Sequence, residues 1–492
     1  KNLLNLIIFF IALSFAGVLV ISIIIFLFQK IGILSENNFF TETLWQGFNL
    51  FFDQNNRLIP WKIRSAGGKG VGVPGLLRML EIAHQKQGKL PWSLLFQPAI
   101  NLAEKGFAVS PRLHKMIRRN RHLKSFASSR KYFYNDSGDP WPIGHILRNP
   151  ALARTLKKIS KEGPDAFYTG GIARDIVSAI NNTKHLPANI KAIDLKNYKA
   201  KVRKPLCRSY RQWRVCGMPP PTSGGSTVIQ ILKLIERFNF SKIRPGSVRA
   251  VHLISEASRL AFADRNQYIA DPDFIKIPLT ALFEPSYIEL RSALISKNKS
   301  MGKAFPGKLF QHQTQKWAPD LGEKRPISTS HISVIDKKGQ AVSMTTSIGS
   351  AFGSRIMVRG FMLNNELTDF AARPQKNSYL KANRAGANKR PRSSMAPTII
   401  TNHLGKLEMV IGSPGGSSII GYTTKAIIGA LDWNLSMQGA ISLPNFVNKN
   451  RKTEIEKQTS LEKIIPALEA MGHVVKVRNK TSGLHGIRVH PW

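Results

Sequence analysis

Residues 326–347 read PISTSHISVIDKKGQAVSMTTS, and this stretch constrains the fold more than any other because it predicts a β-hairpin. Two runs of hydroxyl-bearing and apolar residues flank a Lys-Lys-Gly-Gln turn at 337–340, and glycine accepts the positive φ of a tight hairpin loop. If the two central turn residues form the loop, Thr329 faces Ser347 or Ile348. Rows of hydroxyls usually hydrogen-bond across a sheet, so the hairpin alone does not indicate catalysis.

The beginning of the chain predicts a membrane anchor. No charged residue occurs from Asn2 to Phe28, and about 20 apolar residues in a helix span a bilayer. The residues that follow contain no Ala-x-Ala-like cleavage site, which favours an anchor at 1–32 over a cleaved signal peptide or a buried core helix. We expect a membrane-anchored protein with a periplasmic or extracellular catalytic domain, although the balanced Lys1 and Lys30 do not set the orientation.

Composition indicates a globular protein with a basic surface. The chain has 492 residues, a hydrophobic content of 42% and a formal net charge of +43. Its Lys and Arg residues are scattered without a long basic block, as on a solvated surface. We therefore do not expect nucleic-acid binding as the main function.

The two cysteines lie in a second predicted hairpin. Cys207 and Cys216 flank a loop at 211–212, and this register sets them directly opposite each other. A cross-strand disulfide is then geometrically possible, and two unbridged buried thiols are the alternative. With no His or further Cys nearby, the pair does not suggest a metal site.

Helix-rich and strand-rich parts of the chain alternate, which predicts a layered α/β or α+β domain. Apolar spacing and breakers predict a helix at 76–87, a mostly helical region to 182, a hairpin at 202–218, helices at 228–238 and 248–268, and mainly strands from 330 onward.

A glycine turn in GSPGGSSIIGYTTKAIIGALDW provides the first sign of acyl-transfer chemistry. Gly415 and Gly416 stand at the entrance of a predicted helix, where backbone N–H groups are unpaired and point toward an approaching anion. Such a turn suits an oxyanion hole.

Two further segments offer groups for an amino-acid substrate. LNNELTDF supplies Glu366 and Asp369 as acceptors for an ammonium group. PRSSMAPT supplies Ser393 and Ser394, whose hydroxyls can bind a carboxylate. Each signal is weak alone, since paired serines and acidic turns usually serve folding.

Together and in this order, the segments resemble the γ-glutamyltransferase family of N-terminal-nucleophile hydrolases, which hydrolyse glutathione. The resemblance covers about residues 50–489. It rests on GVGVPG, LPWSLLFQPAINLAEKGF, MPPPTSGGS, EASRLAFADRNQYIADPDF, TSHISVIDKKGQAVSMTTS, FGSRIMVRGFMLNNELTDF, KRPRSSMAPT and GSPGGS.

The resemblance implies a four-layer αββα sandwich made as one self-cleaving precursor. Carried onto this chain, the cut falls between Ser328 and Thr329. After the anchor at 1–32, residues 33–328 then form the large-subunit part of the catalytic domain and residues 329–492 the small-subunit part.

The resemblance also implies the catalytic groups. The Thr329 hydroxyl is the nucleophile, and its freed α-amine, with an ordinary pKa near 8, is the base. Gly415 and Gly416 form the oxyanion hole, and Ser347 hydrogen-bonds the nucleophile. The acyl group passes from glutathione or another γ-glutamyl compound to water, an amino acid or a peptide. No metal or organic cofactor is implied.

Substrate-binding residues follow by the same resemblance. Glu366 and Asp369, with the adjacent Asn365, bind the glutamyl amino group. Ser393 and Ser394 bind its α-carboxylate.

Two departures from the family pattern leave other functions open. Thr41 stands where the family has an arginine that clamps the glutamyl carboxylate, and the family's opening core segment has no counterpart. Losing a strand and a helix would expose apolar surface. The alternatives are an acylase of another dicarboxylic monoamide, in the manner of cephalosporin acylases, and an inactive truncated homologue that stays uncut.

Overall fold

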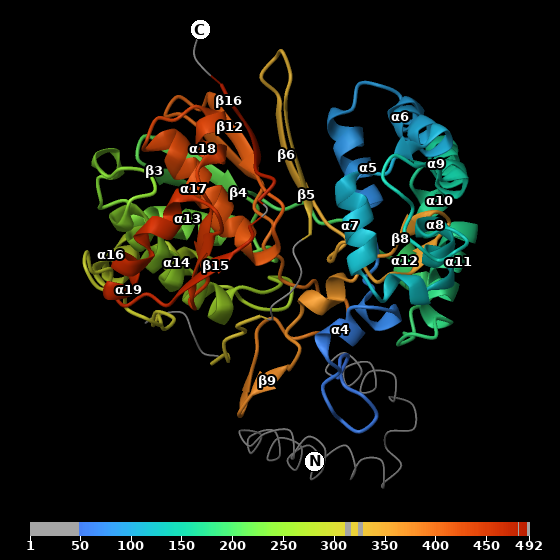
Figure 1. Cartoon of the computed structure of the whole chain (residues 1–492), viewed down its shortest axis with the longest axis horizontal. Coiled ribbons are helices and arrows are strands. Elements are labelled where there is room, and N and C mark those ends of the chain that lie inside the picture. Colours follow the sequence, from blue (N-terminus) through green and yellow to red (C-terminus); the bar gives the residue numbers. More distant parts are fainter. Residues whose placement is uncertain (1–48, 310–315, 323–327, 481, 490–492) are drawn as a thin grey trace, which may run out of the picture.

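The computed structural model describes residues 49–309, 316–322, 328–480 and 482–489. A helical part, on the right in Figure 1, comes from the first third of the described chain. Its elements are α4 (Trp61–Arg64), α5 (Leu76–Gln87), α6 (Trp92–Lys105), β1 (Phe107–Ala108), α7 (Pro111–Arg119), α8 (Ala127–Phe133), β2 (Ile146–Leu147), α9 (Pro150–Glu162), α10 (Asp165–Tyr168), α11 (Gly170–Asn181) and α12 (Ala192–Lys196).

An antiparallel sheet of five strands organises the other part, on the left in Figure 1. Its order is β16 (His485–Arg488), β12 (Leu407–Gly412), β11 (Thr398–Thr401), β4 (Trp213–Gly217) and β3 (Leu206–Tyr210). The helices of this part are α13 (Gly224–Ile235), α14 (Val248–Tyr268), α15 (Leu279–Leu282), α16 (Pro285–Ala293), α17 (Ile419–Leu431), α18 (Met437–Ser442) and α19 (Ile465–Ala470).

Smaller sheets complete the fold. Strand β14 (Thr453–Glu456) lies between β13 (Phe446–Asn448) and β15 (Val475–Arg478), and it pairs with β15 in parallel. Two short hairpins are formed by β7 (Met357–Val358) with β8 (Phe361–Met362) and by β9 (Gln375–Lys376) with β10 (Tyr379–Leu380).

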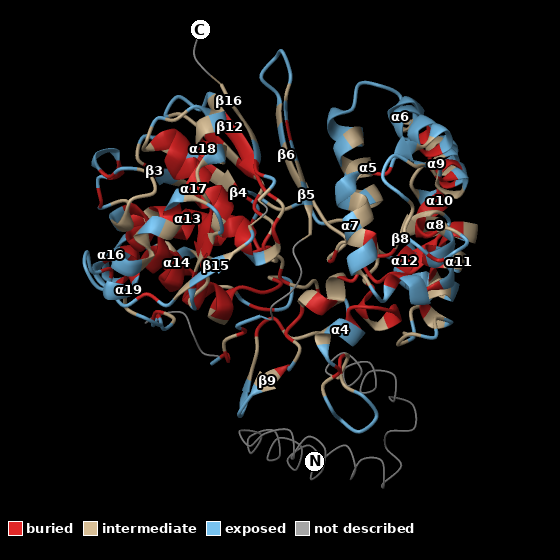
Figure 2. Ribbon diagram, viewed as in Figure 1, coloured by how far each residue is buried: buried red, intermediate tan, exposed pale blue. Residues whose placement is uncertain are grey.

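The main core lies between the five-stranded sheet and helices α13, α14 and α17. Figure 2 shows these helices buried along most of their length. This is expected for α13 and α17, which are apolar on nearly every side, whereas α14 also buries charged residues such as Glu256 and Arg259. Val215, Ile400 and Ile411 of the sheet pack into this core, and burying one such side chain contributes about 1.5–3 kcal/mol. The helical part has its own core around Ile172 and Leu363.

The hairpin predicted at 326–347 is present as β5 (Ser330–Ile335) and β6 (Ala341–Thr346), and in Figure 1 it stands between the two parts. Its loop has three residues rather than the two expected, because the Asp336 carboxylate accepts the N–H groups of Lys338 and Gln340 and widens the turn. Ser330 therefore pairs with Thr346, and the next position in this register sets Thr329 level with Ser347.

The polar face of the hairpin is turned toward the five-stranded sheet. Ser343 Oγ donates to the Ile411 carbonyl, and Ser333 Oγ donates to the His485 carbonyl. The two ring nitrogens of His331 are hydrogen-bonded to Thr345 Oγ1 and to Ser333 Oγ. The hydroxyl rows therefore join two layers of the fold. The opposite face of the hairpin is apolar and about half exposed at Ile332, Val334 and Val342.

The structure thus shows a mixed α/β fold with helices, a sheet and a second β-layer, which agrees with part of the predicted four-layer sandwich. Within the described residues the second β-layer against the sheet is the two-stranded β5–β6 hairpin.

Most predicted elements are confirmed. The helices at 76–87 and 248–268 have the expected bounds, and a disulfide joins Cys207 to Cys216 across the β3–β4 hairpin. Helix α13 begins at Gly224 instead of 228 and ends at 235. A Cβ on Gly225 would lie 2.4 Å from the Met218 carbonyl oxygen, so these glycines permit close packing instead of breaking the helix.

The predicted anchor at 1–32 and Thr41 lie outside the described residues. Among the helices that the structure does describe, none combines the length and apolarity needed to cross a bilayer.

Candidate active site

One cavity of about 1170 Å³ contains all of the predicted catalytic, cleavage and substrate-binding residues. It opens where the glycine turn before α17, the start of β5 and the segment before β11 meet. Its lining includes Ser328, Thr329, Ser347, Asn365, Glu366, Asp369, Ser393, Ser394, Gly415 and Gly416. Residues separated by nearly a hundred positions thus share one site.

Thr329 has an unusual backbone conformation at the predicted cleavage site. Its φ is 128°, which a β-branched residue rarely adopts and which costs on the order of 1–3 kcal/mol. Beside it, Ser347 Oγ accepts a hydrogen bond from Gly349 N–H at 2.9 Å. Within the described residues Ser347 is not bonded to Thr329, but its hydroxyl retains a hydrogen to donate.

The glycine turn presents two backbone donors to the cavity. Gly415 has φ 143° and Gly416 has φ 54°, and a short 3₁₀ turn at 416–418 leads from them into α17. Among the described residues, no acceptor bonds the N–H group of either glycine. A side chain at Gly415 would meet the Tyr422 ring at 2.8 Å, so the turn requires glycine there.

Glu366 and Asp369 occupy one 3₁₀ turn, in which side chains three positions apart point the same way. Both carboxylates line the cavity and are half-buried. Asn365 also lines the cavity, and its role in substrate binding stays a prediction. Its amide donates to the Ser65 carbonyl and to Ser350 Oγ and accepts from Ser350 N–H, so the geometry favours a positioning role over substrate contact.

A buried arginine supports the serine pair. Ser394 Oγ accepts a hydrogen bond from Arg265 Nη2 at 2.8 Å, and Arg265 Nε donates to Ser223 Oγ at 2.7 Å. Ser223 in turn bonds the Ser393 carbonyl. Arg265 brings a positive charge to the place predicted for a carboxylate, and the sequence analysis assigned it no role although its segment carried the resemblance.

Arg392 fixes the backbone in front of these serines. Its Nη2 donates to Asp320 Oδ2 at 2.9 Å, and its Nη1 donates to the Arg265 carbonyl. Burial alone would raise the pKa of Asp320, but the charge of Arg392 and a hydrogen bond from Asn383 hold it below its usual value. The buried Arg392–Asp320 ion pair therefore holds in place the backbone that precedes Ser393 and Ser394.

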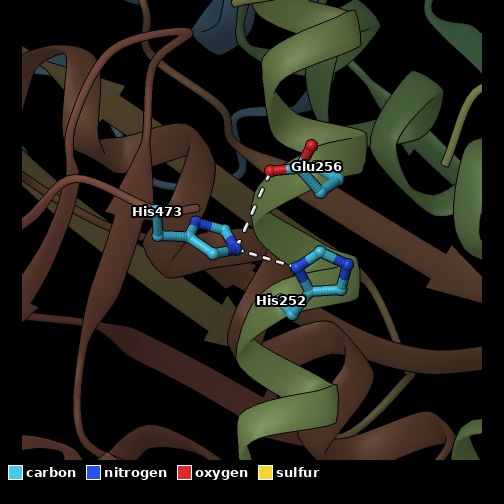
Figure 3. Close-up of side chains that lie close together, drawn as sticks. All are labelled: His252, Glu256 and His473. Carbon is cyan, nitrogen blue, oxygen red and sulfur yellow. Dashed lines mark hydrogen bonds and ion pairs between the residues drawn. The ribbon is translucent and has the colours of Figure 1, made fainter. Parts of the chain in front are cut away.

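One group of metal-ligand residues lies outside the cavity. Figure 3 shows His252 and Glu256 on α14 with His473 against them, and their ligand atoms lie within 4.8 Å of one another. These ligand atoms already have hydrogen-bond partners within the protein. His252 Nδ1 and His473 Nε2 are 2.8 Å apart, and Glu256 accepts a hydrogen bond from Arg259 Nε at 2.7 Å. Burial lowers the pKa of His473 to about 4. We interpret the group as a hydrogen-bonded histidine pair that joins α14 to the β14–β15 layer.

Comparison with known proteins decides the family. Residues 48–491 match the gamma-glutamyltranspeptidase family. The chain belongs to this family. It is 35% identical over 433 residues to the glutathione hydrolase proenzyme of Escherichia coli (strain K12), which covers 85% of this chain and 72% of that protein.

Other relatives of the chain have acylase names. The chain is 32% identical over 431 residues to the Acylase ACY 1 proenzyme of Pseudomonas sp. (strain SE83), covering 86% of this chain and 72% of that protein. The crystal structure of cephalosporin acylase from Bacillus halodurans superimposes with a TM-score of 0.72 at 23% identity, covering 85% of this chain and 73% of that one. This likeness shows that the two proteins share a fold.

Proposed function

We propose that the protein is a γ-glutamyltransferase and glutathione hydrolase that activates itself by cutting between Ser328 and Thr329. One observation carries the proposal: a single cavity combines a threonine in a strained backbone, two glycine N–H donors, a pair of carboxylates and a serine pair bonded to arginine. Each group matches one requirement of γ-glutamyl transfer.

The first step is self-cleavage. Thr329 Oγ attacks the Ser328 carbonyl carbon, the peptide C–N bond breaks, and Ser328 is left as an ester on the threonine. The Thr329 nitrogen takes up the hydroxyl proton and becomes a free α-amine, and water then hydrolyses the ester to a Ser328 carboxyl group and a free Thr329 hydroxyl. The unusual φ of Thr329 supports this step, because cleavage relieves the backbone constraint.

The catalytic cycle uses the same hydroxyl. The α-amine accepts the proton of Thr329 Oγ, which attacks the γ-glutamyl amide carbonyl. The N–H groups of Gly415 and Gly416 stabilise the tetrahedral oxyanion. The amine product leaves with the proton, and the acyl-enzyme passes its γ-glutamyl group to water or to another amine. Ser347 positions the hydroxyl by donating a hydrogen bond to it.

The acyl part of the substrate binds between two groups of opposite charge. Glu366 and Asp369 receive its ammonium group, and Ser393 and Ser394 receive its α-carboxylate. Arg265 supplies the positive charge through its bond to Ser394. This arrangement compensates in part for Thr41, which stands where the family has an arginine.

Hydrolysis of another dicarboxylic monoamide is the second candidate. The identity to the Acylase ACY 1 proenzyme favours it. Thr41 does not separate the two candidates, because a dicarboxylic monoamide keeps the free carboxylate that the family's arginine clamps. The two carboxylates of the 366–369 turn favour the first candidate, since they suit an ammonium group.

A denaturing gel of the purified protein tests self-cleavage. We expect fragments of 328 and 164 residues, with mass spectrometry placing Thr329 at the start of the smaller one. The Thr329→Ala variant should stay at full length, while Ser330→Ala, one residue further, should still be cut. An uncut wild-type chain would refute the proposal and favour the inactive homologue.

A γ-glutamyl anilide and a glutaryl anilide then separate the two candidates. Faster release of aniline from the γ-glutamyl compound supports the first, and the reverse supports the acylase.

We also propose that residues 1–32 anchor the enzyme to a membrane with the catalytic domain in the periplasm or outside the cell. Recovery of the full chain in the membrane fraction, and of a 33–492 variant in the soluble fraction, tests this.

A further inference from the structure

Beyond the glycine turn, the cavity wall carries an excess of positive charge. Six cations from the β13–β15 sheet and its connections line this side of the cavity together with a single carboxylate, Glu454. We name these six cations the cationic rim: Lys449, Arg451, Lys452, Lys476, Arg478 and Lys480. Lys449 directly follows β13, and Lys476 and Arg478 belong to β15.

Glu454 is neutralised within the rim itself. Lys480 Nζ lies 2.5 Å from one of its carboxylate oxygens, and Arg478 Nε lies 3.7 Å from the other. The Lys480 side chain is only 2% exposed, so this pair is largely withdrawn from solvent. The charges of Lys449, Arg451, Lys452 and Lys476 therefore exceed the negative charge on this side of the cavity.

Lys449 lies nearest to the proposed reaction centre. Its Nζ donates to Ser417 Oγ at 3.2 Å, and Ser417 directly follows Gly416 in the glycine turn. A hydroxyl accepts a hydrogen bond but does not neutralise an ammonium charge. Burial lowers the pKa of Lys449 to about 8, an effect that Glu454 opposes and that Lys480 and Arg265 increase. A partly buried cation among other cations is stabilised by a bound anion.

We propose that the cationic rim binds a carboxylate on the amine side of the substrate and that Lys449 contacts it. This inference rests on the proposed acyl transfer at Thr329. Arg265 and Ser394 already provide a site for the carboxylate of the acyl part. The cationic rim is therefore a second positively charged region of the same cavity. The favoured substrate class is γ-glutamyl compounds whose leaving amine carries its own carboxylate, such as peptides with a free C-terminus. Because an acceptor amine enters where the leaving amine departs, acceptors with a free carboxylate are favoured as well.

A pair of chromogenic substrates tests the inference on the processed enzyme. One is a γ-glutamyl 4-nitroanilide, and the other is the same anilide with a carboxylate on its ring. We expect the wild-type kcat/KM to be higher for the carboxylated anilide, and we expect this preference to shrink at high salt. In Lys449→Gln the ratio of the two kcat/KM values should fall about tenfold, the scale of one charged hydrogen bond. Lys449→Arg should keep most of the ratio.

Lys338→Gln is the matched control, because Lys338 is exposed at the tip of the β5–β6 hairpin and does not line the cavity. It should leave both rates unchanged. If Lys449→Gln cleaves both anilides in the wild-type ratio, the inference is wrong while the proposed function stands. If the processed wild-type enzyme cleaves neither anilide, the proposed function and this inference both fail.

Discussion

Arg265 Nη2 lies 2.8 Å from Ser394 Oγ, and this bond joins a buried guanidinium of α14 to a hydroxyl that the sequence places more than a hundred residues away. Since Arg265 is only 7% exposed, its charge acts through a medium of low dielectric constant. The bond explains how a serine pair can receive a carboxylate.

Arg265→Gln should weaken binding of the acyl donor. Loss of a charged hydrogen bond costs about 1.5–3 kcal/mol, so we expect KM for a γ-glutamyl anilide to rise about ten- to a hundredfold, with a smaller change in kcat. Ser394→Ala in the same background should add little, because the two residues act as a pair. Independent, additive effects of the two substitutions would contradict the assignment.

The glycine turn should respond differently at its two positions. Gly415→Ala brings a Cβ to 2.8 Å from the Tyr422 ring, so both N–H donors shift and kcat should fall about a hundredfold. Gly416→Ala meets no atom within 4 Å and has φ 54°, which alanine adopts for about 1 kcal/mol. Its kcat should fall only a few-fold. Steady-state kinetics of the two processed variants measures this contrast, and equal losses would argue against an oxyanion hole at this turn.

Asp320→Asn should destabilise the fold beneath the serine pair. It removes the buried partner of Arg392, and breaking a buried ion pair costs about 3–5 kcal/mol. Because the pKa of Asp320 is lowered, its contribution is complete at neutral pH and is lost only as pH falls through and below the ordinary carboxyl range.

Urea unfolding in the uncut Thr329→Ala background measures this free energy without subunit dissociation. Glu162→Gln is the control, because the Lys158–Glu162 pair is exposed and is worth at most about 1 kcal/mol. Similar losses for the two substitutions would contradict the prediction.

The hairpin should make the protein sensitive to acid through His331. Burial, together with the charge of His485, lowers the pKa of His331 to about 4. Between pH 6.5 and about 4, His331 is therefore protonated in the unfolded chain but stays neutral in the folded chain. The free energy of unfolding falls as pH is lowered through this range.

His331→Gln should reduce this fall, while His473 continues to contribute to it. Thermal unfolding across this pH range measures the slope. His403→Gln, at an exposed position in the β11–β12 turn, should leave the slope unchanged. A wild-type slope in His331→Gln would show that His331 is not held neutral.

Local patterns predicted much of the fold. Apolar spacing gave the bounds of α5 and α14, and the turn residues gave both hairpins. The predicted loop of the β5–β6 hairpin had two residues, whereas the observed loop has three, because the Asp336 carboxylate selects a wider turn. Helix α13 begins earlier than predicted, because glycines that usually end a helix allow a close packing contact at this position.

The order of residues by itself determined which chemistry the chain can carry: a threonine at a strand start, a glycine turn before a helix, an acidic turn and a serine pair. Only the tertiary structure decided that these groups share one cavity, that the Asn365 amide is bonded to Ser65 and Ser350, and that Arg265 and Lys449 line the same cavity. The physical reason is that spacing along a chain fixes neighbours within one helix or hairpin, whereas contacts across hundreds of residues depend on how the layers pack.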